Sequence, residues 1–457
     1  METYTLTRTI PVDASFDIAV LGGGPGGAAA AICAGRLGAK VVLVEATGCL
    51  GGMGTAGLVS AWSDLGDGDR TIAGGIMSEI LRRMHEIGGI RQEADLNAIC
   101  TALHGGSGFQ PEALKRLLDQ MCIDAGVEIR YMTRLIDVDF DGATVNGVIV
   151  NNVEGHSYIK AKAFIDATGD AVLSDLCGVP CFEAGRDSAH IMPPTLCAAL
   201  AEIDFSRWSR NTDEAVRQGI AEGFFTQNDR HVPGIFRSGK STAIQNAGHL
   251  FEMNALNCRS LSDGYIKGRL LADEYYRFFR QAMPGCEEMV FVATASLMGI
   301  RESRRIHGEY ELNYADFVAR RAFPDQIAVY NKSVDIHVYD TSDEQYARYS
   351  AEFLDVDRPK RGETYGLPYG ILVPKAWSNL WVAGRCNSSD AKVSAAIRDQ
   401  PACYMMGQAA GTAAVQSLRT GQPACDLNTQ TLIETLRTAG AYLPQESTSA
   451  KMTRSDG

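Results

Sequence analysis

The chain has 457 residues, 45% of them hydrophobic and 21% charged, which is the composition of a globular protein large enough for two or three domains. Its net charge of −12, from 55 acidic and 43 basic residues, disfavours binding to nucleic acids and to anionic membranes. Residues 1–16 lack a basic region followed by an apolar core, so we expect no signal peptide there. The uncharged stretch 18–35 is too rich in glycine to be a membrane span. We therefore expect a cytoplasmic protein.

The 12 cysteines include no Cys-x-x-Cys pair, and the closest two are Cys177 and Cys181. Without a secretion signal, this spacing favours free thiols over a disulfide framework. It also disfavours an iron–sulfur cluster, and no ligand spacing typical of zinc is present. We predict no metal site.

A glycine-rich loop follows the first predicted strand, 17–21, and opens an alanine-rich helix over 25–37. Gly22, Gly24 and Gly27 have the spacing of a dinucleotide-binding loop. The first glycine allows a tight turn, the second lets the backbone approach a pyrophosphate, and the third packs the helix against the strand. The positive end of the helix dipole then favours a phosphate at this loop.

The next predicted strand, 40–45, ends in Glu45, which lies 18 residues after Gly27. At about this interval a carboxylate hydrogen-bonds a ribose hydroxyl of the dinucleotide. No arginine follows Glu45 directly, which argues against a ribose 2′-phosphate and hence against NADP. Residues 16–46 therefore read as a βαβ dinucleotide-binding unit.

The elements that follow are predicted from periodicity and turn signals. A second glycine-rich segment covers 49–57, and helices are expected over 72–87 and from Gln110 to Gly126. Next comes a predicted meander of strands at 127–131, 135–140, 144–153 and 158–160, with turns at Asp141-Gly142 and Asn146-Gly147, followed by a buried strand at 163–167. From 184 to 365, helices such as 265–281 and strands such as 289–295 mix without βαβ regularity. A buried strand at 379–384, a small-residue helix over 402–418 and a polar tail follow.

Five segments resemble one known family. They are the glycine loop with Glu45, the segment 50–55, the segment 165–170, the strand 379–384 with Arg385 and the helix containing Gly407-Gln408-Ala409-Ala410-Gly411, and the segment 299–305. Together they are similar to the FAD-dependent oxidoreductases of the glutathione-reductase superfamily, in the branch related to succinate dehydrogenase and fumarate reductase flavoproteins. The first four segments are specific for FAD in combination, and the fifth identifies the branch without fixing a substrate. The resemblance extends over about residues 14–420.

The resemblance implies an α/β fold: a Rossmann-like FAD-binding domain with a three-stranded β-meander, and an inserted α+β substrate domain. The boundaries we expect are 1–183 and 366–445 for the FAD-binding domain, 184–365 for the substrate domain and 446–457 for a disordered tail. The cofactor it implies is FAD. The residues expected to bind it are Gly22, Gly24, Pro25, Gly26, Gly27, Glu45, Ala46, Gly51, Gly52, Met53, Thr55, Leu135, Thr168, Gly169, Asp170, Gly384 and Arg385.

Two features depart from the disulfide reductases of that superfamily. Those enzymes have a cysteine pair after the second glycine segment, where this chain has Met53, Gly54 and Thr55. They also have a second dinucleotide-binding unit, whereas the only other glycine cluster here, 104–108, follows no apolar strand. Dithiol chemistry and a dedicated NAD(P)H domain are therefore not expected.

Two clusters are candidates for substrate chemistry. Arg301 and Arg305 follow the apolar run 289–299, so either could bind a substrate carboxylate with two parallel hydrogen bonds. The alternative for them is a salt-bridged structural corner. Strict alternation in 333–339 places Asp335, His337 and Tyr339 on one strand face, where His337 or Tyr339 could act as acid or base. The alternative there is an exposed polar face.

The function we expect is an FAD-dependent oxidoreductase that acts on a small organic substrate by hydride transfer to or from flavin N5. Whether it is a dehydrogenase, an oxidase or a reductase stays open. The alternative is a flavoprotein electron-transfer subunit that works with a partner protein, which an uncovered apolar patch around 184–365 would favour. The partners this implies are a small-molecule substrate and either a second copy of the chain or a protein electron acceptor.

Overall fold

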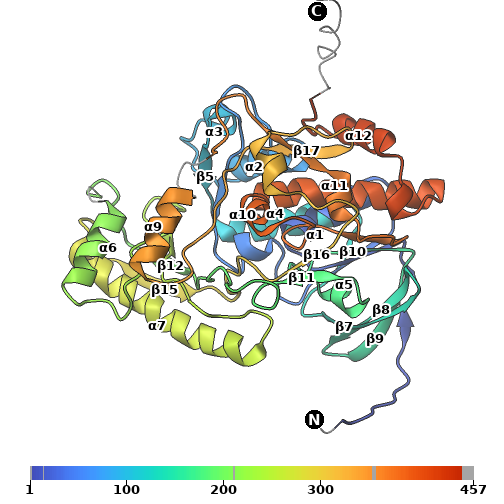
Figure 1. The fold of residues 1–457 in the computed structure, drawn as a ribbon, viewed down its shortest axis with the longest axis horizontal. Helices are drawn as coiled ribbons and strands as arrows, with labels where there is room; N and C mark the ends of the chain where they lie inside the picture. The colour runs from blue at the N-terminus through green and yellow to red at the C-terminus, as the bar shows by residue number, and fades with distance from the viewer. Residues whose placement is uncertain (1–2, 14, 209–210, 353–356, 445–457) are drawn as a thin grey trace, which may run out of the picture.

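A five-stranded parallel sheet forms the centre of the computed structural model, which describes residues 3–13, 15–208, 211–352 and 357–444 (Figure 1). Its strand order is β19-β10-β2-β3-β6. The strands are β2 (Ile18–Leu21), β3 (Val41–Val44), β6 (Glu128–Arg130), β10 (Ala163–Asp166) and β19 (Leu380–Val382). Because β19 pairs with β10, residues from both ends of the chain share one sheet.

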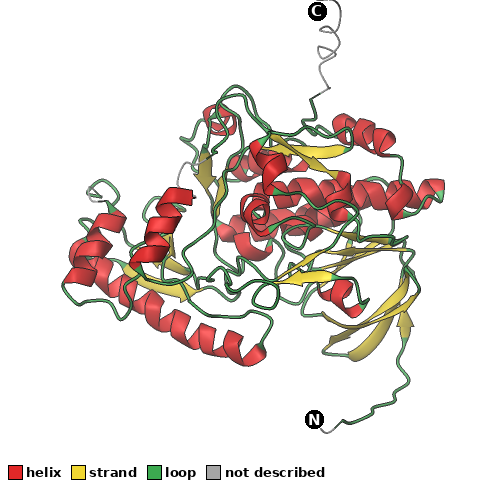
Figure 2. Cartoon of the chain, viewed as in Figure 1, coloured by secondary structure: helices red, strands yellow, loops and turns green. Residues whose placement is uncertain are grey.

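Both faces of this sheet are buried, which explains why its strands are apolar at every position. Ile18 and Val20 pack into the core on one face, beneath the helices α1 (Pro25–Arg36), α4 (Pro111–Asp124) and α11 (Gln400–Thr420). Ala19 and Leu21 pack on the other face against an antiparallel meander of β7 (Arg134–Asp141), β8 (Thr144–Asn152) and β9 (Gly155–Lys160). The short β1 (Val12–Asp13) adds a strand parallel to β9. The expected α/β Rossmann-like fold with a three-stranded meander is confirmed (Figure 2).

Helix α11 is buried along nearly its whole length and lies tightly against α1. A Cβ atom added at Gly407 would lie 2.0 Å from the carbonyl oxygen of Gly26, and one added at Gly411 would lie 2.2 Å from that of Ala30. Glycine at these two positions therefore lets the two helix backbones touch.

We expect Gly411→Val to lower the free energy of unfolding by about 3 kcal/mol, because its Cβ would meet backbone that cannot move aside. Chemical denaturation of the mutant measures this loss. Thr420→Val, at the exposed end of the same helix, is the control and should change stability little. Equal stability of the two variants would contradict the packing argument.

Three local predictions are wrong. The strand at 127–131 is β6 and lies beside β3 in the parallel sheet, because α4 returns the chain to that sheet. Asn146-Gly147 lies inside β8, which pairs with β9, and forms no turn. Glycine at 147 leaves room for the ring of Tyr158, since a Cβ there would lie only 2.3 Å from it. The segment 332–338 forms no strand.

The residues between β11 (Cys181–Glu183) and β16 (Arg304–Ile306) contain a separate four-stranded antiparallel sheet. Its order is β13-β14-β12-β15, with β12 (Ala198–Ala201), β13 (Gly234–Arg237), β14 (Ala243–Asn246) and β15 (Val290–Thr294). Helices α6 (Thr212–Ala221) and α7 (Cys258–Ala282) cover it through a core of its own, which includes Leu200, Tyr275 and Phe279. This part lies at the lower left of Figure 1.

The remaining elements connect these two parts. The paired strands are β4 (Ala61–Ser63) with β5 (Gly106–Gly108), β11 with β16, and β17 (Gln326–Tyr330) with β18 (Tyr365–Pro368). The helices are α2 (Ile76–Glu86), α3 (Leu96–Thr101), α5 (Val172–Leu176), α8 (Tyr314–Val318), α9 (Asp343–Glu352), α10 (Ala391–Ile397) and α12 (Thr429–Thr438), with short 3-10 turns at Gly52–Gly54, Tyr369–Leu372 and Ala424–Asp426. The predicted helix over 72–87 is α2, which begins only after Gly74-Gly75.

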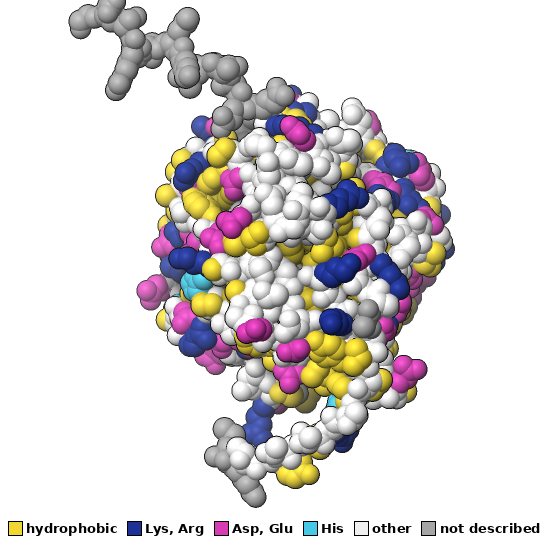
Figure 3. Space-filling model, turned by 90° about the vertical axis from the view of Figure 1, so that its right-hand side faces the viewer, with side chains coloured by type: hydrophobic (Ala, Val, Ile, Leu, Met, Phe, Trp, Pro, Cys, Tyr) yellow, Lys and Arg dark blue, Asp and Glu magenta, His cyan; other side chains and the backbone are white. Residues whose placement is uncertain are grey.

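Acidic and basic side chains are interspersed over the face of the molecule shown in Figure 3. In the described residues, no helix is long and apolar enough to cross a membrane. The tail 446–457, expected to be disordered, lies outside the described residues.

Candidate functional site

The glycine loop between β2 and α1 is shaped by three different constraints. Gly22 has φ +98°, and a Cβ there would lie 2.4 Å from the carbonyl oxygen of Ala167. A Cβ at Gly27 would lie 1.8 Å from the carbonyl oxygen of Gly22. Gly24 differs, since a Cβ there would meet no protein atom within 4 Å. Space is therefore open in front of Gly24, the residue that caps the N-terminus of α1 without a side-chain bond.

A second loop lies against the first. A Cβ at Gly52 would lie 3.0 Å from the Cα atom of Gly24, and the amide of Gly51 donates to the carbonyl of Gly23 over 2.8 Å. Gly51 and Gly52 have φ values of +96° and +49°, which favour glycine. The Thr55 hydroxyl donates to the carbonyl of Leu50 over 2.6 Å and closes the loop around Met53.

Glu45, at the end of β3, is buried and braces the first loop. Its Oε2 atom accepts from the amide of Gly23 over 2.6 Å, and its Oε1 atom accepts from the amide of Thr47 over 2.7 Å. Ala46 lies between Glu45 and Thr47 in the sequence. The ribose contact of Glu45 is a prediction that these two bonds neither require nor prevent.

The segments 168–170 and 384–385 meet beside these loops. The Asp166 carboxylate accepts from the Thr168 and Ser174 side chains, which fixes the turn after β10. Arg385 Nη2 donates to Asp170 Oδ1 over 2.6 Å, and a Cβ at Gly169 would lie 3.2 Å from Arg385 Nη2.

A Cβ at Gly26 would lie 2.8 Å from the carbonyl oxygen of Ala383, which places Gly384 next to α1. The first loop and the turns after β10 and β19 thus converge at the carboxyl ends of the parallel strands, where such folds bind ligands. Leu135 lies in β7, and its side chain packs on the meander core.

A buried pair of imidazoles lies outside this loop cluster. His249, after β14, and His337, in the segment 332–338, are 0% and 4% exposed. His249 Nε2 lies 2.7 Å from His337 Nδ1, and His249 Nδ1 lies 2.9 Å from Asp229 Oδ2. The exposed polar face proposed as the alternative for 333–339 is therefore wrong for His337.

Burial determines the charge of this pair. It lowers the pKa of His249, and together with the nearby Arg301 guanidinium it lowers the pKa of His337 well below the ordinary range. Burial acts to raise the pKa of Asp229, but the hydrogen bonds that it accepts from His249 and from the amide of His231 hold this pKa below its usual range. At neutral pH both imidazoles are uncharged, and Asp229 is a carboxylate.

Arg301 is 6% exposed and lies in the electrostatic neighbourhood of both histidines. Its Nη1 atom donates to the carbonyl of Pro193 over 2.6 Å and to Thr195 Oγ1 over 3.0 Å. Burial, followed by the charge of Arg398, lowers the pKa of Arg301 to about 10. Among the described residues no carboxylate forms an ion pair with it. Its Nε and Nη2 atoms have no hydrogen-bond partner there and are not sealed from solvent, so they can receive an anion.

Arg305 and Tyr339 have other partners. Arg305 Nη1 donates to Glu302 Oε1 over 2.9 Å, and its guanidinium lies 4.2 Å from the ring centroid of Phe182. This is the salt-bridged corner named as the alternative for 301–305. Tyr339 stacks on His190 with ring centroids 4.7 Å apart.

A second polar cluster lies next to the imidazole pair. Asp335 Oδ1 lies 3.6 Å from His337 Nε2, and Asp335 Oδ2 accepts from Arg398 over 3.1 Å. Lys332 forms ion pairs of 3.3 Å with Asp64 and with Asp399, the residue before α11. The Asp335 side chain is 37% exposed, so this cluster opens to solvent.

Sequence reasoning missed Asp229, His249, Lys332, Arg398 and the pair of His104 with Asp64, whose side chains are 2.8 Å apart. In the structure, positive φ values of 58° for Asp64 and 54° for His104 mark this pair, but the sequence carries no signal of them. His249 and His337 are 88 residues apart in the chain, and no local pattern connects them. All 12 cysteines are free thiols, and no group of described His, Cys, Asp and Glu residues could hold a metal ion.

A family model described as FAD dependent oxidoreductase matches residues 17–436. No curated protein is significantly similar to the chain in sequence. Among solved structures, a geranylgeranyl bacteriochlorophyll reductase-like protein from Thermoplasma acidophilum is 12% identical, with 95% of this chain and 85% of that chain covered and a TM-score of 0.48. The p-nitrophenol 4-monooxygenase from Pseudomonas putida is 12% identical, with 94% and 82% covered and a TM-score of 0.43. A myxobacterial chondrochloren halogenase is 13% identical, with 94% and 79% covered and a TM-score of 0.43.

Proposed function

The chain belongs to the FAD dependent oxidoreductase family, and from this premise we propose that it oxidises or reduces a small anionic organic molecule by hydride transfer to or from flavin N5. The observation that carries the proposal is the unpaired, buried Arg301 beside the neutral base His337. The finer family placement, in the glutathione-reductase superfamily near succinate dehydrogenase and fumarate reductase flavoproteins, is part of this proposal. So are a cytoplasmic location and the domain boundaries at 183 and 365.

FAD fits the loop cluster, because the open space at Gly24 is what a bound pyrophosphate requires of its second glycine. The residues proposed to hold it are the loop residues Gly22, Gly24, Pro25, Gly26 and Gly27 with Glu45 and Ala46, the second loop with Gly51, Gly52, Met53 and Thr55, and the residues Leu135, Thr168, Gly169, Asp170, Gly384 and Arg385. When bound, FAD supplies an acceptor or donor of a hydride at N5.

The protein's own residues then bind the substrate and move its proton. Arg301 offers Nε and Nη2 to a carboxylate, and this orients the substrate with two parallel charge-assisted hydrogen bonds. During substrate oxidation the uncharged His337 takes a proton at Nε2. Substrate reduction is the reverse transfer, from a His337 that already carries a proton at Nε2. Tyr339 and Arg305 are weaker candidates for these roles, because each already contacts other side chains.

Two measurements test this function. Heating the purified protein should release FAD, identified by chromatography. Anaerobic mixing of the holoenzyme with a panel of small carboxylic acids that bear a hydroxyl, amino or saturated carbon group should bleach the flavin absorbance with at least one of them. A chromophore other than FAD, or bleaching by uncharged alcohols only, would contradict the proposal.

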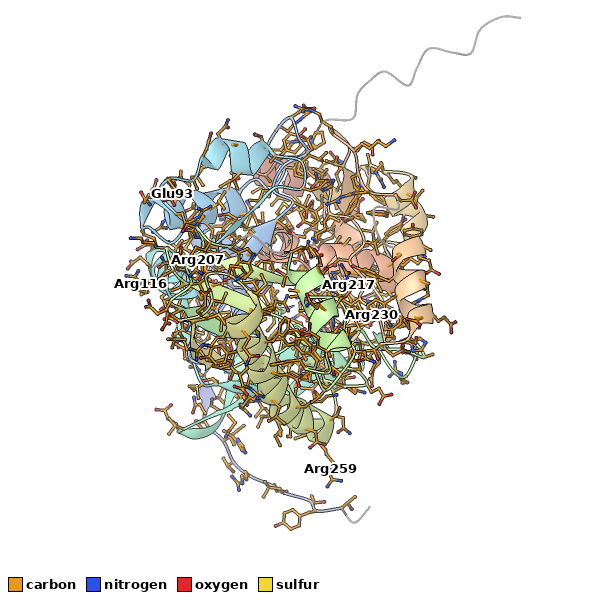
Figure 4. All side chains as sticks on the ribbon, turned by 90° about the vertical axis from the view of Figure 1, so that its left-hand side faces the viewer. Glu93, Arg116, Arg207, Arg217, Arg230 and Arg259 are labelled. Carbon is orange, nitrogen blue, oxygen red and sulfur yellow. The ribbon has the colours of Figure 1, made fainter. Side chains whose placement is uncertain are left out.

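We expect Arg301→Gln to weaken substrate binding about 10- to 100-fold, because charge-assisted hydrogen bonds to a carboxylate each contribute roughly 1.5–3 kcal/mol. The measurement is the substrate dependence of flavin bleaching. Arg301→Lys should recover only part of the affinity, since an ammonium cannot form the bidentate pair. Arg259→Gln, at the exposed start of α7 and labelled in Figure 4, is the control and should bind substrate normally.

An electron-transfer subunit is the second candidate, because large apolar side chains are exposed within 184–365, where a partner protein could dock. Ile266 and Leu270 lie one turn apart on α7 and are 61% and 67% exposed, and Val290 and Val292 on β15 are exposed as well. For such a subunit, the reduced flavin would be reoxidised slowly by small acceptors and rapidly by the oxidised partner protein. Ile266→Ser would slow only the second reaction.

A further inference from the structure

Asp229 is an anchored carboxylate behind the imidazole pair. Its Oδ2 atom accepts from the amide and from Nδ1 of His249, over 3.0 and 2.9 Å. Its Oδ1 atom accepts from the amide of His231 over 3.3 Å and from the hydroxyl of Tyr346 on α9 over 3.1 Å. An ionised carboxylate only accepts hydrogen bonds, so His249 must carry its proton on Nδ1.

The tautomer of His337 follows from that of His249. A neutral imidazole with its proton on Nδ1 has a lone pair on Nε2. Because His249 Nε2 faces His337 Nδ1 over 2.7 Å, His337 must donate from Nδ1. Its own Nε2 atom is then left without a proton. Among the described residues the nearest acceptor to this atom is Asp335 Oδ1, at 3.6 Å, which is beyond hydrogen-bond distance.

We propose that Asp229 and His249 are positioning residues that hold His337 with its base, Nε2, toward the substrate and carry away the positive charge that His337 would otherwise acquire. This inference rests on the proposed function. In the step, the substrate proton bonds to His337 Nε2, and the Nδ1 proton of His337 passes to Nε2 of His249. One proton enters and one leaves His337, so it ends neutral, and His249 becomes the imidazolium.

The charges around the pair give a physical reason for the second histidine. Arg301 acts on His337 as a like charge, whereas Asp335, whose Oδ1 atom lies 3.6 Å from His337 Nε2, acts as an opposite charge. A cation held on His337 is repelled by Arg301. On His249 the same charge lies against the Asp229 carboxylate at 2.9 Å, in a buried site where the attraction is strong. The ring of His231 also lies near His249, with the two ring centroids 6.1 Å apart.

The test is nitrogen-15 NMR of the histidine-labelled holoenzyme, with the His337 signals assigned by their loss in His337→Ala. We expect wild-type His337 to be protonated at Nδ1. Asp229→Asn offers an amide N–H to His249 Nδ1, so it should move the proton of His249 to Nε2 and that of His337 to Nε2 as well. Flavin reduction by substrate should then slow by roughly a hundredfold or more. Tyr346→Phe, which removes one bond to Asp229 and leaves the chain of imidazoles intact, should keep the wild-type tautomer.

His249→Asn keeps a donor to Asp229 but removes the contact to His337, and it serves if Asp229→Asn does not fold. It should give a mixture of His337 tautomers and a similar loss of rate. Wild-type His337 protonated at Nε2, or a normal reduction rate in a variant whose tautomer has changed, would overturn the inference. The proposed function fails separately, if neither His337→Ala nor Arg301→Gln affects reduction, because the tautomer measurement needs no substrate.

Discussion

Replacing His337 with alanine should slow reduction of the flavin by substrate about 10²- to 10⁴-fold, the contribution of a well-placed general base. FAD should stay bound, because the residues proposed to hold it lie in the loop cluster and not in 332–338. Anaerobic stopped-flow mixing of substrate with the flavin-loaded variant measures the rate constant directly. His156→Ala, on β9 in the meander, is the control and should reduce at the wild-type rate.

The pH dependence of the same rate constant tests the protonation state of His337. Burial and Arg301 lower the pKa of His337, so its neutral form persists to a lower pH than that of an exposed histidine. The rate of substrate oxidation should therefore stay constant through neutral pH and fall only on acidification below the ordinary histidine range. A fall that begins above pH 7 would exclude His337 as the base.

Gly24→Val should abolish retention of FAD, and the fold should survive. Gly24 has φ −65°, which valine adopts without strain, and its added Cβ would meet no protein atom within 4 Å. The new side chain would instead occupy the space in which a pyrophosphate approaches the backbone. The ratio of flavin to protein absorbance in the purified variant, together with its melting temperature, measures both effects.

Gly27→Val is the contrasting variant. Its Cβ would lie 1.8 Å from the carbonyl oxygen of Gly22, so this change should destabilise the protein itself. Loss of FAD from Gly24→Val at unchanged stability would thus separate a cofactor contact from a packing contact. A fully flavin-loaded Gly24→Val protein would refute the placement of the pyrophosphate.

The amino-acid sequence by itself determined the FAD-binding half of this protein. The glycine spacing, the apolar strands at 17–21, 40–45 and 163–167 and the helix from Pro111 depend on residues that are near one another in the chain, so periodicity and turn chemistry predict them. The family and its cofactor followed from the same segments. Even here, strand β6 was assigned to the wrong sheet, because pairing partners are not encoded locally.

Only the tertiary structure decided the candidate catalytic site. Arg301 and Arg305 are alike in sequence, yet Glu302 neutralises one of them and leaves the other unpaired. The role proposed for His337 depends on its contact with His249, 88 residues away, and on the burial that favours the neutral form of both imidazoles. Charge state and tautomer depend on desolvation and on partners brought together by folding, and no spacing in the sequence specifies either of them.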